Sequence, residues 1–410
     1  MPESNRNSPA KIYSVEQVRQ LELIASEDYG ISSYCLMKRA AYFSYEVLKQ
    51  HWPSANNIAV VCGFGNNAGD GYVLAKLAID DGKQVEVINM CNTENLNGDV
   101  AIAYQDLSTT NVCLQNYSMN IFDGVDVIVD ALFGTGLNRD IKGKFCDLIK
   151  LMNESECPSI SIDIPSGINA NTGQIMNVAV SADVTATFIG LKQGMFTNEG
   201  LAASGKIELS DLDIPEEIYQ QINLNSPTHT VSRLMLHDLN KVLKRRQRNS
   251  HKGHFGHVLV VGGDEGYLGA ARMAAEAAAR VGSGLVSIAT RCSHASSLSA
   301  VRPEVMSHPV ETRDDLMQLI ERATVIVIGP GLGKSEWAKL LLASVLESNL
   351  PIVIDADALN LLAERKKFSK AWVITPHPGE AARLLDIDTK KIQQDRFKSL
   401  GALHEKFQGP

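Results

Sequence analysis

Short runs of β-branched and other apolar residues alternate along this chain with longer stretches of helical periodicity. This alternation is typical of α/β folds, in which helices connect parallel strands. In the first half it predicts strands over residues 57–62, 84–90, 125–130, 159–164 and 183–189. In the second half it predicts strands over residues 257–261, 284–290, 324–328, 351–355 and 372–375. We therefore expect an α/β protein built of three-layer α/β/α domains.

A polar segment with a proline, residues 221–230, separates the two sets of strands, and the basic stretch 244–248 follows it. We place the domain boundary near residue 227, with a first domain over residues 10–226 and a second over residues 227–410. No short-period repeat is visible, so two different α/β domains are favoured over a solenoid.

Composition and charge fit a chain of this kind and exclude several classes of partner. The 410 residues allow two domains with full cores, and 44% hydrophobic with 21% charged residues is ordinary for a globular protein. A net charge of −8 gives no general attraction for nucleic acid or anionic membrane. No apolar run approaches the roughly 18 residues that span a bilayer. The seven scattered cysteines predict reduced, mostly buried thiols, and we expect a cytoplasmic homo-oligomer.

A glycine-rich segment, GFGNNAGDG at residues 63–71, lies between the predicted strand 57–62 and a predicted helix over residues 72–80. Such a strand-to-helix turn presents backbone N–H groups to phosphate, although the spacing also fits a plain tight turn. A dehydrogenase would carry an acid at the end of the next strand to hold a ribose. That strand ends in Asn89, Met90 and Cys91, which disfavours a dehydrogenase.

Two further polar turns follow predicted strands, DALFGTGLNR at residues 130–139 and DIPSGIN at residues 163–169. Each places an aspartate, Asp130 or Asp163, at a strand end next to a turn rich in glycine or serine. One such residue could simply cap a helix. Three polar turns at one sheet edge instead predict a binding site beyond the carboxyl ends of the strands.

The segments GFGNNAGDG, DALFGTGL and DIPSGINANTG, in this order, resemble the NAD(P)H-hydrate epimerases across about residues 10–220. The resemblance implies a Rossmann-like fold and a substrate of hydrated NADH or NADPH, whose C6 hydroxyl is interconverted between R and S forms. It also implies a potassium ion held by Asn67, Asp130 and Ser166, whose oxygens suit a hard cation. Ala68 replaces the glycine usual in the family, which is harmless if its φ is negative.

The same resemblance implies the residues that contact the dinucleotide. They are Asn66, Asn67, Ala68, Gly69, Asp70, Gly134, Thr135, Gly136, Leu137, Asn138, Arg139, Asp140 and Asp163. It places Asp163 at the reacting ring as the catalytic residue. Epimerisation at a carbinolamine-like carbon requires water to leave and return on the other face, and a carboxylate can shuttle that proton. Lys192 is either a second polar group of the site or a solvated turn lysine.

Polar turns also follow the strands of the second half, among them GPGLG at residues 329–333, DADALN at 355–360 and TPHPGE at 375–380. With residues 253–271 they resemble the ADP-dependent NAD(P)H-hydrate dehydratases, which are ribokinase-like, across about residues 228–400. The resemblance implies that ADP binds and that Ala270, Ala271, Gly331 and His377 touch the hydrated nicotinamide. The phosphate loop and catalytic aspartate that follow TPHPGE in the family are not found. We therefore expect an incomplete domain without dehydratase activity.

Other interpretations remain open at this point. The leading one is a bifunctional nicotinamide-dinucleotide repair enzyme. The alternatives are a non-catalytic dinucleotide- or partner-binding module and a ribokinase-like small-molecule kinase. His251, His254 and His257 could bind zinc, but a loop leading into a strand would splay them. The basic residues 244–248 fit a solvated helix face better than a nucleic-acid site.

Overall fold

The computed structural model describes residues 11–115, 120–225, 231–364 and 371–409. The chain forms two compact units, Met1–Val242 and Leu243–Pro410. This division lies after the predicted boundary near residue 227, because β10 (Val231–Ser232) pairs with β1 (Lys11–Tyr13) of the first unit. Residues 10, 226–230 and 410, on which the predicted domain limits fall, lie outside the described residues.

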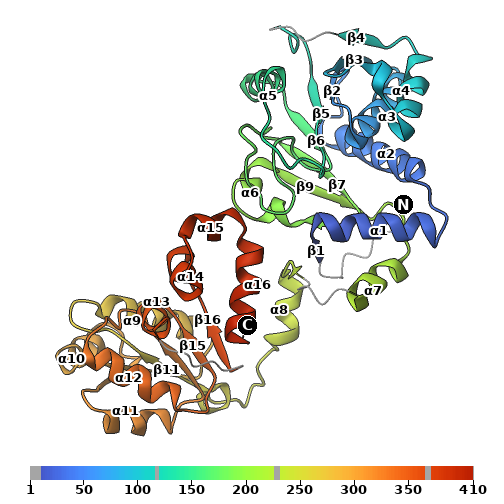
Figure 1. Cartoon of the computed structure of the whole chain (residues 1–410). Helices are drawn as coiled ribbons and strands as arrows, with labels where there is room; N and C mark the ends of the chain where they lie inside the picture. The colour runs from blue at the N-terminus through green and yellow to red at the C-terminus, as the bar shows by residue number, and fades with distance from the viewer. Residues whose placement is uncertain (1–10, 116–119, 226–230, 365–370, 410) are drawn as a thin grey trace. The chain divides into compact units, whose positions relative to one another are not determined.

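Seven parallel strands form the central sheet of the first unit, in the order β4-β3-β2-β5-β6-β7-β9 (Figure 1). They are β2 (Asn57–Cys62), β3 (Gln84–Asn89), β4 (Cys113–Gln115), β5 (Val127–Ala131), β6 (Ser159–Ile162), β7 (Val184–Phe188) and β9 (Lys206–Ser210). The five strands predicted here are confirmed, with ends shifted by at most two residues. The edge strands β4 and β9 were not predicted, because neither is a continuous buried apolar run.

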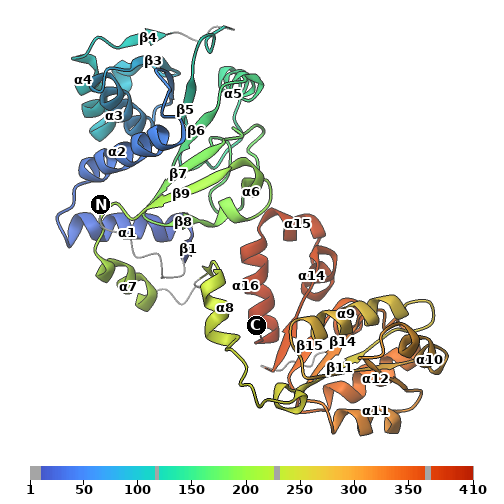
Figure 2. The ribbon, with the colours of Figure 1, turned by 180° about the vertical axis from the view of Figure 1, so that it is seen from behind.

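Helices cover both faces of this sheet, so the predicted three-layer arrangement is confirmed (Figure 2). One face carries α2 (Ser33–His51), α3 (Asn66–Asp80) and α4 (Gly98–Ser108), and the other carries α5 (Lys144–Glu154). Alternate residues of β2 enter the two cores: Ile58 and Val60 face the first, and Ala59 and Val61 face the second. A strand buried on both faces is expected in a parallel sheet covered by helices.

Helix α3 begins at Asn66, so the prediction of a helix from residue 72 placed its start too late. Gly65 is the N-cap, and residues 66–71 form the first turns of the helix. Ala68 is fully buried inside the helix without a positive φ, which explains why alanine fits there. The tight turn is confined to Gly63–Gly65, where a Cβ on Gly63 would lie 2.1 Å from the carbonyl oxygen of Leu132.

A second, three-stranded sheet in the order β10-β1-β8 completes the first unit. Strand β8 (Leu191–Lys192) runs parallel to β1, with Tyr13 opposite Lys192. These strands of two or three residues were not predicted, because they are too short to show an alternation of apolar and polar residues. The other helices are α1 (Val15–Glu27), α6 (Gly200–Ala203), α7 (Glu216–Asn225), α8 (Leu236–Val242), η1 (Thr93–Asn95) and η2 (Gln193–Phe196).

The second unit has six parallel strands in the order β13-β12-β11-β14-β15-β16. They are β11 (His257–Val261), β12 (Leu285–Thr290), β13 (Met306–Pro309), β14 (Val325–Ile328), β15 (Ile352–Ile354) and β16 (Trp372–Ile374). One core contains α9 (Leu268–Arg280) and α10 (Cys292–Val301). The other contains α11 (Arg313–Ile320), α12 (Glu336–Leu346), α13 (Ala356–Leu362), α14 (Pro378–Leu385), α15 (Thr389–Gln394) and α16 (Arg396–Phe407). The five strands predicted in this half are confirmed, and β13 is a sixth strand that was not predicted.

Three smaller expectations are corrected. Ala270 and Ala271 lie in the first turns of α9, not in a turn before it. Residues 244–248 are exposed but not helical, so the predicted helix face is wrong. All seven cysteines are free, but only Cys62 and Cys146 are buried, so the thiols are not mostly buried. In the part of the chain that the structure describes, no helix is both long and apolar enough to cross a bilayer.

Candidate active site

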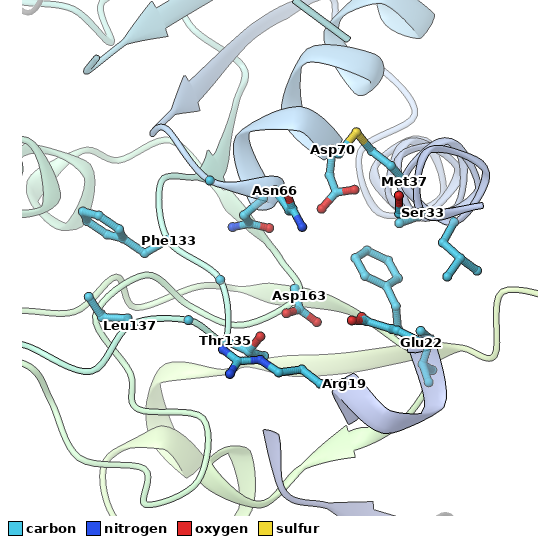
Figure 3. A pocket seen from close by; sticks show the side chains of 18 of the residues that line it. Arg19, Glu22, Ser33, Met37, Asn66, Asp70, Phe133, Thr135, Leu137 and Asp163 are labelled. Carbon is cyan, nitrogen blue, oxygen red and sulfur yellow. The ribbon is translucent and has the colours of Figure 1, made fainter. Parts of the chain in front are cut away.

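The strand order of the first unit changes direction between β2 and β5. The chain proceeds outward to β3 and β4 on one side and to β6, β7 and β9 on the other. The loops that follow such a pair of strands diverge, and ligands of open α/β sheets bind in the crevice between them. A pocket of about 430 Å³ lies here, lined by Asn66, Asn67, Asp70, residues 134–139 and Asp163 (Figure 3). The three predicted turns therefore meet.

Not every predicted residue lines this pocket. Ala68 and Gly69 are buried within α3, and Asp140 is exposed outside it. A Cβ on Gly69 would lie 2.7 Å from the sulfur of Met37, so this glycine permits close packing of α2 on α3. Asp130 is buried beneath the pocket rather than lining it.

Asp163 follows β6 and projects into the pocket, where it forms an ion pair with Lys192. Its φ of 69° is in the left-handed region, which costs of order 1 kcal/mol for a residue with a side chain. The Lys192 side chain is only 1% exposed, and it also donates to Thr187 Oγ1 at 2.8 Å and the carbonyl of Phe188 at 3.0 Å. A solvated turn lysine is therefore excluded, and Lys192 is a buried cation of the site.

Asp130 occupies the centre of a buried polar network. One carboxylate oxygen accepts from Ser161 Oγ at 2.8 Å and from the Ser166 N–H at 2.8 Å, and the other accepts from Ser166 Oγ at 2.5 Å. Burial raises the pKa of Asp130, and the hydrogen bonds from Ser166 and Ser161 only partly oppose this effect. All of its hydrogen-bond donors among the described residues are uncharged. The network therefore lacks a positive charge to offset an ionised carboxylate.

Asn67 is 6% exposed, yet neither its amide oxygen nor its amide nitrogen has a hydrogen-bond partner among the described residues. An unsatisfied buried amide costs about 1–3 kcal/mol. Asn67 packs against the loop of Gly134, since a Cβ on that glycine would lie 3.3 Å from the Cβ of Asn67. The adjacent Phe133 N–H donates to Ser166 Oγ at 2.8 Å. The bare amide oxygen of Asn67 and the carboxylate of Asp130, which are linked through the Gly134 loop and Ser166, are oxygen ligands of the kind that a monovalent cation prefers.

Carboxylates other than Asp163 also face the pocket. Burial, followed by the charges of Asp163 and Glu22, raises the pKa of Asp70 well above its usual range. Glu22 is exposed at the pocket, but the surrounding protein and the charge of Asp163 raise its pKa as well. Two acids with raised pKa values beside a lysine-paired carboxylate form a site suited to proton transfer.

Sequence analysis missed much of the pocket wall. Helix α1 contributes Arg19 and Glu22, and α2 contributes Ser33 and Met37. Neither helix contains a glycine-rich turn, and their only sequence signal was amphipathic periodicity. Phe64 and Phe133 were inside quoted motifs but had no predicted role. Their rings pack edge to face with centroids 6.2 Å apart and supply an apolar wall.

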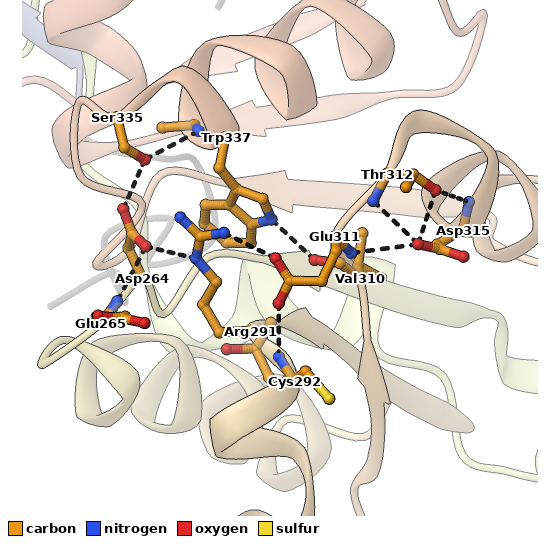
Figure 4. A network of polar contacts seen from close by, with 12 residues as sticks. Asp264, Glu265, Arg291, Cys292, Val310, Glu311, Thr312, Asp315, Ser335 and Trp337 are labelled. Carbon is orange, nitrogen blue, oxygen red and sulfur yellow. Dashed lines mark hydrogen bonds and ion pairs between the residues drawn. The ribbon is translucent and has the colours of Figure 1, made fainter.

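The second unit has a related change of strand direction, between β11 and β14. Here Asp264 is fully paired (Figure 4). It accepts from Arg291 Nε at 2.7 Å and from Ser335 Oγ at 2.7 Å. Burial alone would raise the pKa of Asp264, but the hydrogen bonds from Arg291 and Ser335 lower it. Arg291 also binds Glu311 at 2.8 Å and lies over the ring of Trp337.

The residues predicted to touch the dehydratase substrate are only partly assembled. The carbonyl of Gly331 accepts from the Asp264 N–H at 2.7 Å, and Ala271 is buried next to Gly263. His377 caps α14 through an Nδ1 that accepts from the Gly379 N–H at 3.0 Å. Within the described residues, the side chain of His377 forms hydrogen bonds or ion pairs only with Gly379 and Glu380, and none with Ala270 or Gly331.

The three histidines considered for zinc do not converge on one point. His251 and His254 stack with ring centroids 3.7 Å apart. His257 instead uses Nδ1 toward the Arg322 carbonyl at 3.1 Å and Nε2 toward Ser287 Oγ at 2.8 Å. Both ring nitrogens of His257 are therefore occupied by hydrogen bonds.

Comparison with known proteins adds to this geometry. The family model described as YjeF-related protein N-terminus matches residues 33–194, and that of NAD(P)H-hydrate dehydratase matches residues 258–409. The bifunctional NAD(P)H-hydrate repair enzyme Nnr of Coxiella burnetii is 45% identical, over 97% of this chain and 80% of that protein. The Escherichia coli enzyme of the same name is 38% identical, over 98% and 76%. A Bacillus subtilis ADP/ATP-dependent NAD(P)H-hydrate dehydratase structure is 27% identical, with a TM-score of 0.35, over 41% of this chain and 60% of that one.

The two resemblances expected from the sequence are confirmed by these matches. The expectation that the second unit lacks dehydratase activity stays a prediction. The chain belongs to the family of bifunctional NAD(P)H-hydrate repair enzymes, and both the epimerase and the dehydratase domain of that family are present.

Proposed function

We propose that the pocket between β2 and β5 binds hydrated NADH or NADPH and interconverts the R and S forms at C6, with Asp163 as the catalytic residue. The observation that carries this proposal is the Asp163–Lys192 ion pair inside the pocket. The Asp163 carboxylate thus combines a buried lysine partner with a left-handed backbone conformation, a strain that persists mainly at functional sites.

The pocket has separate features for the two ends of such a substrate. The N-terminus of α3 at Asn66 and the glycine loop 134–136 offer backbone N–H groups, which suit a pyrophosphate. Arg19 lies 4.0 Å from the Cβ position of Gly136 and adds a positive charge there. The Asp163 carboxylate lies at the nicotinamide end, where a negative charge would stabilise an iminium-like intermediate.

We further propose that Asn67, Asp130 and Ser166 hold a potassium ion. The orphaned amide of Asn67 and the uncompensated charge of Asp130 support this assignment. When bound, the ion would neutralise Asp130 and help fix the loops that follow β5 and β6. In this account Ser166 and Phe133 orient those loops, and Asp163 performs the proton transfer.

Thermal unfolding tests the potassium site without relying on activity. At a potassium concentration ten times the Kd, the ion should raise the free energy of unfolding by about 1.4 kcal/mol relative to the same concentration of tetramethylammonium. Asn67→Ala should abolish this difference, while the exposed neighbour variant Asn66→Ala should keep it. Equal unfolding of the wild-type chain in both salts would refute the site.

For the second unit, we propose that residues following β11, β14 and β16 bind the hydrated nicotinamide, namely Ala270, Ala271, Gly331 and His377, and that ADP is the nucleotide. The close approach of the Gly331 and Asp264 loops supports a formed crevice there. A cytoplasmic location and a homo-oligomeric state stay predictions.

The test of the epimerase proposal is chromatography of the separated hydrates. Purified chain should bring either hydrate to the same R to S ratio well ahead of a protein-free blank. Gly136→Trp should block this, because nothing but Arg19 lies within 4 Å of the added Cβ and the indole would fill the pocket. Gly269→Trp has equally open surroundings in the second unit and should leave the rate unchanged. Conversion at the blank rate by the wild-type chain would refute the function.

A further inference from the structure

Helix α1 lies before the residues that the first family model matches, yet it supplies part of the pocket. Arg19 and Glu22 are three positions apart and so share one face of the helix. The adjacent face is fixed in the core, where Leu21 and Ala25 are completely buried. Figure 3 shows Glu22 directed into the pocket toward Asp163, with the Arg19 guanidinium near Thr135.

The start of α1 is anchored next to the catalytic ion pair. Ser14 and the side chain of Gln17 form a capping box, and the Val15 N–H donates to Asn171 Oδ1 at 2.8 Å. One residue earlier, Tyr13 pairs across β1 and β8 with Lys192. The position of Glu22 is therefore coupled to that of Lys192 by regular secondary structure.

Two carboxyl groups of the pocket differ in what neutralises them. Asp163 forms an ion pair with the Lys192 ammonium. Glu22 forms no hydrogen bond or ion pair within the described residues. The surrounding protein and then the charge of Asp163 raise its pKa, against smaller opposing effects of Lys192 and Arg19. Asp70, on α3, is the other acidic group coupled to both. A carboxyl group without an ionic partner that faces an ion-paired carboxylate across a pocket is the arrangement of an acid–base pair.

We propose that Glu22 is a second acid–base residue of the epimerisation, acting on the face of C6 opposite to Asp163. This inference rests on the proposed function of the pocket. In one direction the Glu22 carboxyl gives its proton to the C6 hydroxyl, the C–O bond breaks, and water leaves. The electron pair of N1 forms the C=N bond of an iminium. Water then adds to C6 from the other face, the iminium π pair returns to N1, and Asp163 takes the released proton.

The reverse direction uses the same groups with their roles exchanged. After each turnover the proton on Asp163 returns to Glu22, directly or through solvent in the open pocket. No oxidant, reductant or further reactant is consumed.

The experiment measures kcat and kcat/KM of hydrate epimerisation against pH for wild type, Glu22→Gln and Glu22→Asp. Wild-type kcat/KM should fall on the alkaline side as Glu22 loses its proton. Glu22→Gln should lower kcat by about a hundredfold with KM changed less than about threefold, since a general acid is worth 10²–10⁴. The alkaline fall of kcat/KM should shift or disappear in Glu22→Gln. Glu22→Asp should recover part of kcat and should again show a fall of kcat/KM at alkaline pH. Glu27→Gln, exposed on the same helix, is the matched control and should behave as wild type.

The pH profile decides between a chemical and a structural role. A Glu22→Gln variant that keeps the wild-type alkaline limb overturns the proposal, whatever its rate, because a merely structural loss would scale the curve without moving it. Failure of the proposed function looks different, since the wild-type chain itself would then not exceed the blank.

Discussion

In each unit, a glycine at the end of a central strand approaches the loop that follows the neighbouring strand. A Cβ on Gly63, after β2, would lie 2.1 Å from the Leu132 carbonyl oxygen, and a Cβ on Gly262, after β11, would lie 2.2 Å from the Pro330 carbonyl oxygen. The two sheets also change direction at these strands. The two units thus share the same close backbone approach at the point where α/β sheets bind ligands.

The polar groups at these strand ends differ between the units in how well their hydrogen bonds and charges are satisfied. Asp264 of the second unit is satisfied by Arg291 and Ser335. In the first unit Asn67 is unsatisfied, Asp130 is buried among neutral donors, and Asp163 has a left-handed backbone. Strain and unsatisfied polar groups persist where function requires them. The comparison teaches that the shared backbone arrangement provides a crevice for chemistry in each unit. The strained and unsatisfied polar groups then indicate which crevice is used.

The largest effect on stability is expected when the ion pair of the first unit is broken. Asp163→Asn leaves the buried ammonium of Lys192 without its carboxylate, which should cost about 3–5 kcal/mol. Adding Lys192→Met should restore most of this loss. Urea unfolding of the first unit, followed by hydrogen exchange, gives the values. A single variant as stable as wild type would mean that the pair contributes nothing to the fold.

The glycine variants break the feature that the units share. Gly63→Ala and Gly262→Ala each force a backbone carbonyl to move, and each should destabilise its own unit by about 3 kcal/mol, near the top of the range for overpacking. Calorimetry that resolves the two transitions should show each variant lowering one of them. If either variant lowers both equally, the units do not fold as separate bodies.

The smallest effect concerns the paired aspartate of the second unit. Asp264→Asn should cost about 2 kcal/mol at neutral pH, because charged hydrogen bonds to Arg291 and Ser335 are weakened. The folded pKa of Asp264 is lowered, so its contribution is present above the unfolded pKa of about 4 and is lost as pH falls through the folded value. Wild type and variant should converge in acid unfolding below about pH 4. A difference that stays constant with pH would contradict the ion pair.

The sequence was sufficient for elements that carry their own signal. Continuous apolar runs predicted β2 and β5, and the three polar turns that were predicted to lie together line one pocket. Arg19 and Glu22 were missed because a helix that delivers charges to a distant pocket has the same periodicity as one that exposes them to solvent. Lys192 was left undecided because its burial depends on strand β8, which is too short to detect. Such positions are fixed by tertiary packing, which a local pattern does not contain.

The most direct test of the central claim is the epimerase assay on Asp163→Asn and Asp264→Asn side by side, at a temperature where both are folded. The account predicts that Asp163→Asn loses about 10²–10⁴ in turnover, alone and in the double variant with Lys192→Met, while Asp264→Asn stays within about threefold of wild type. A chain that keeps more than about a tenth of its turnover without Asp163, or that loses epimerisation with Asp264, would contradict the assignment of the reaction to the pocket of the first unit.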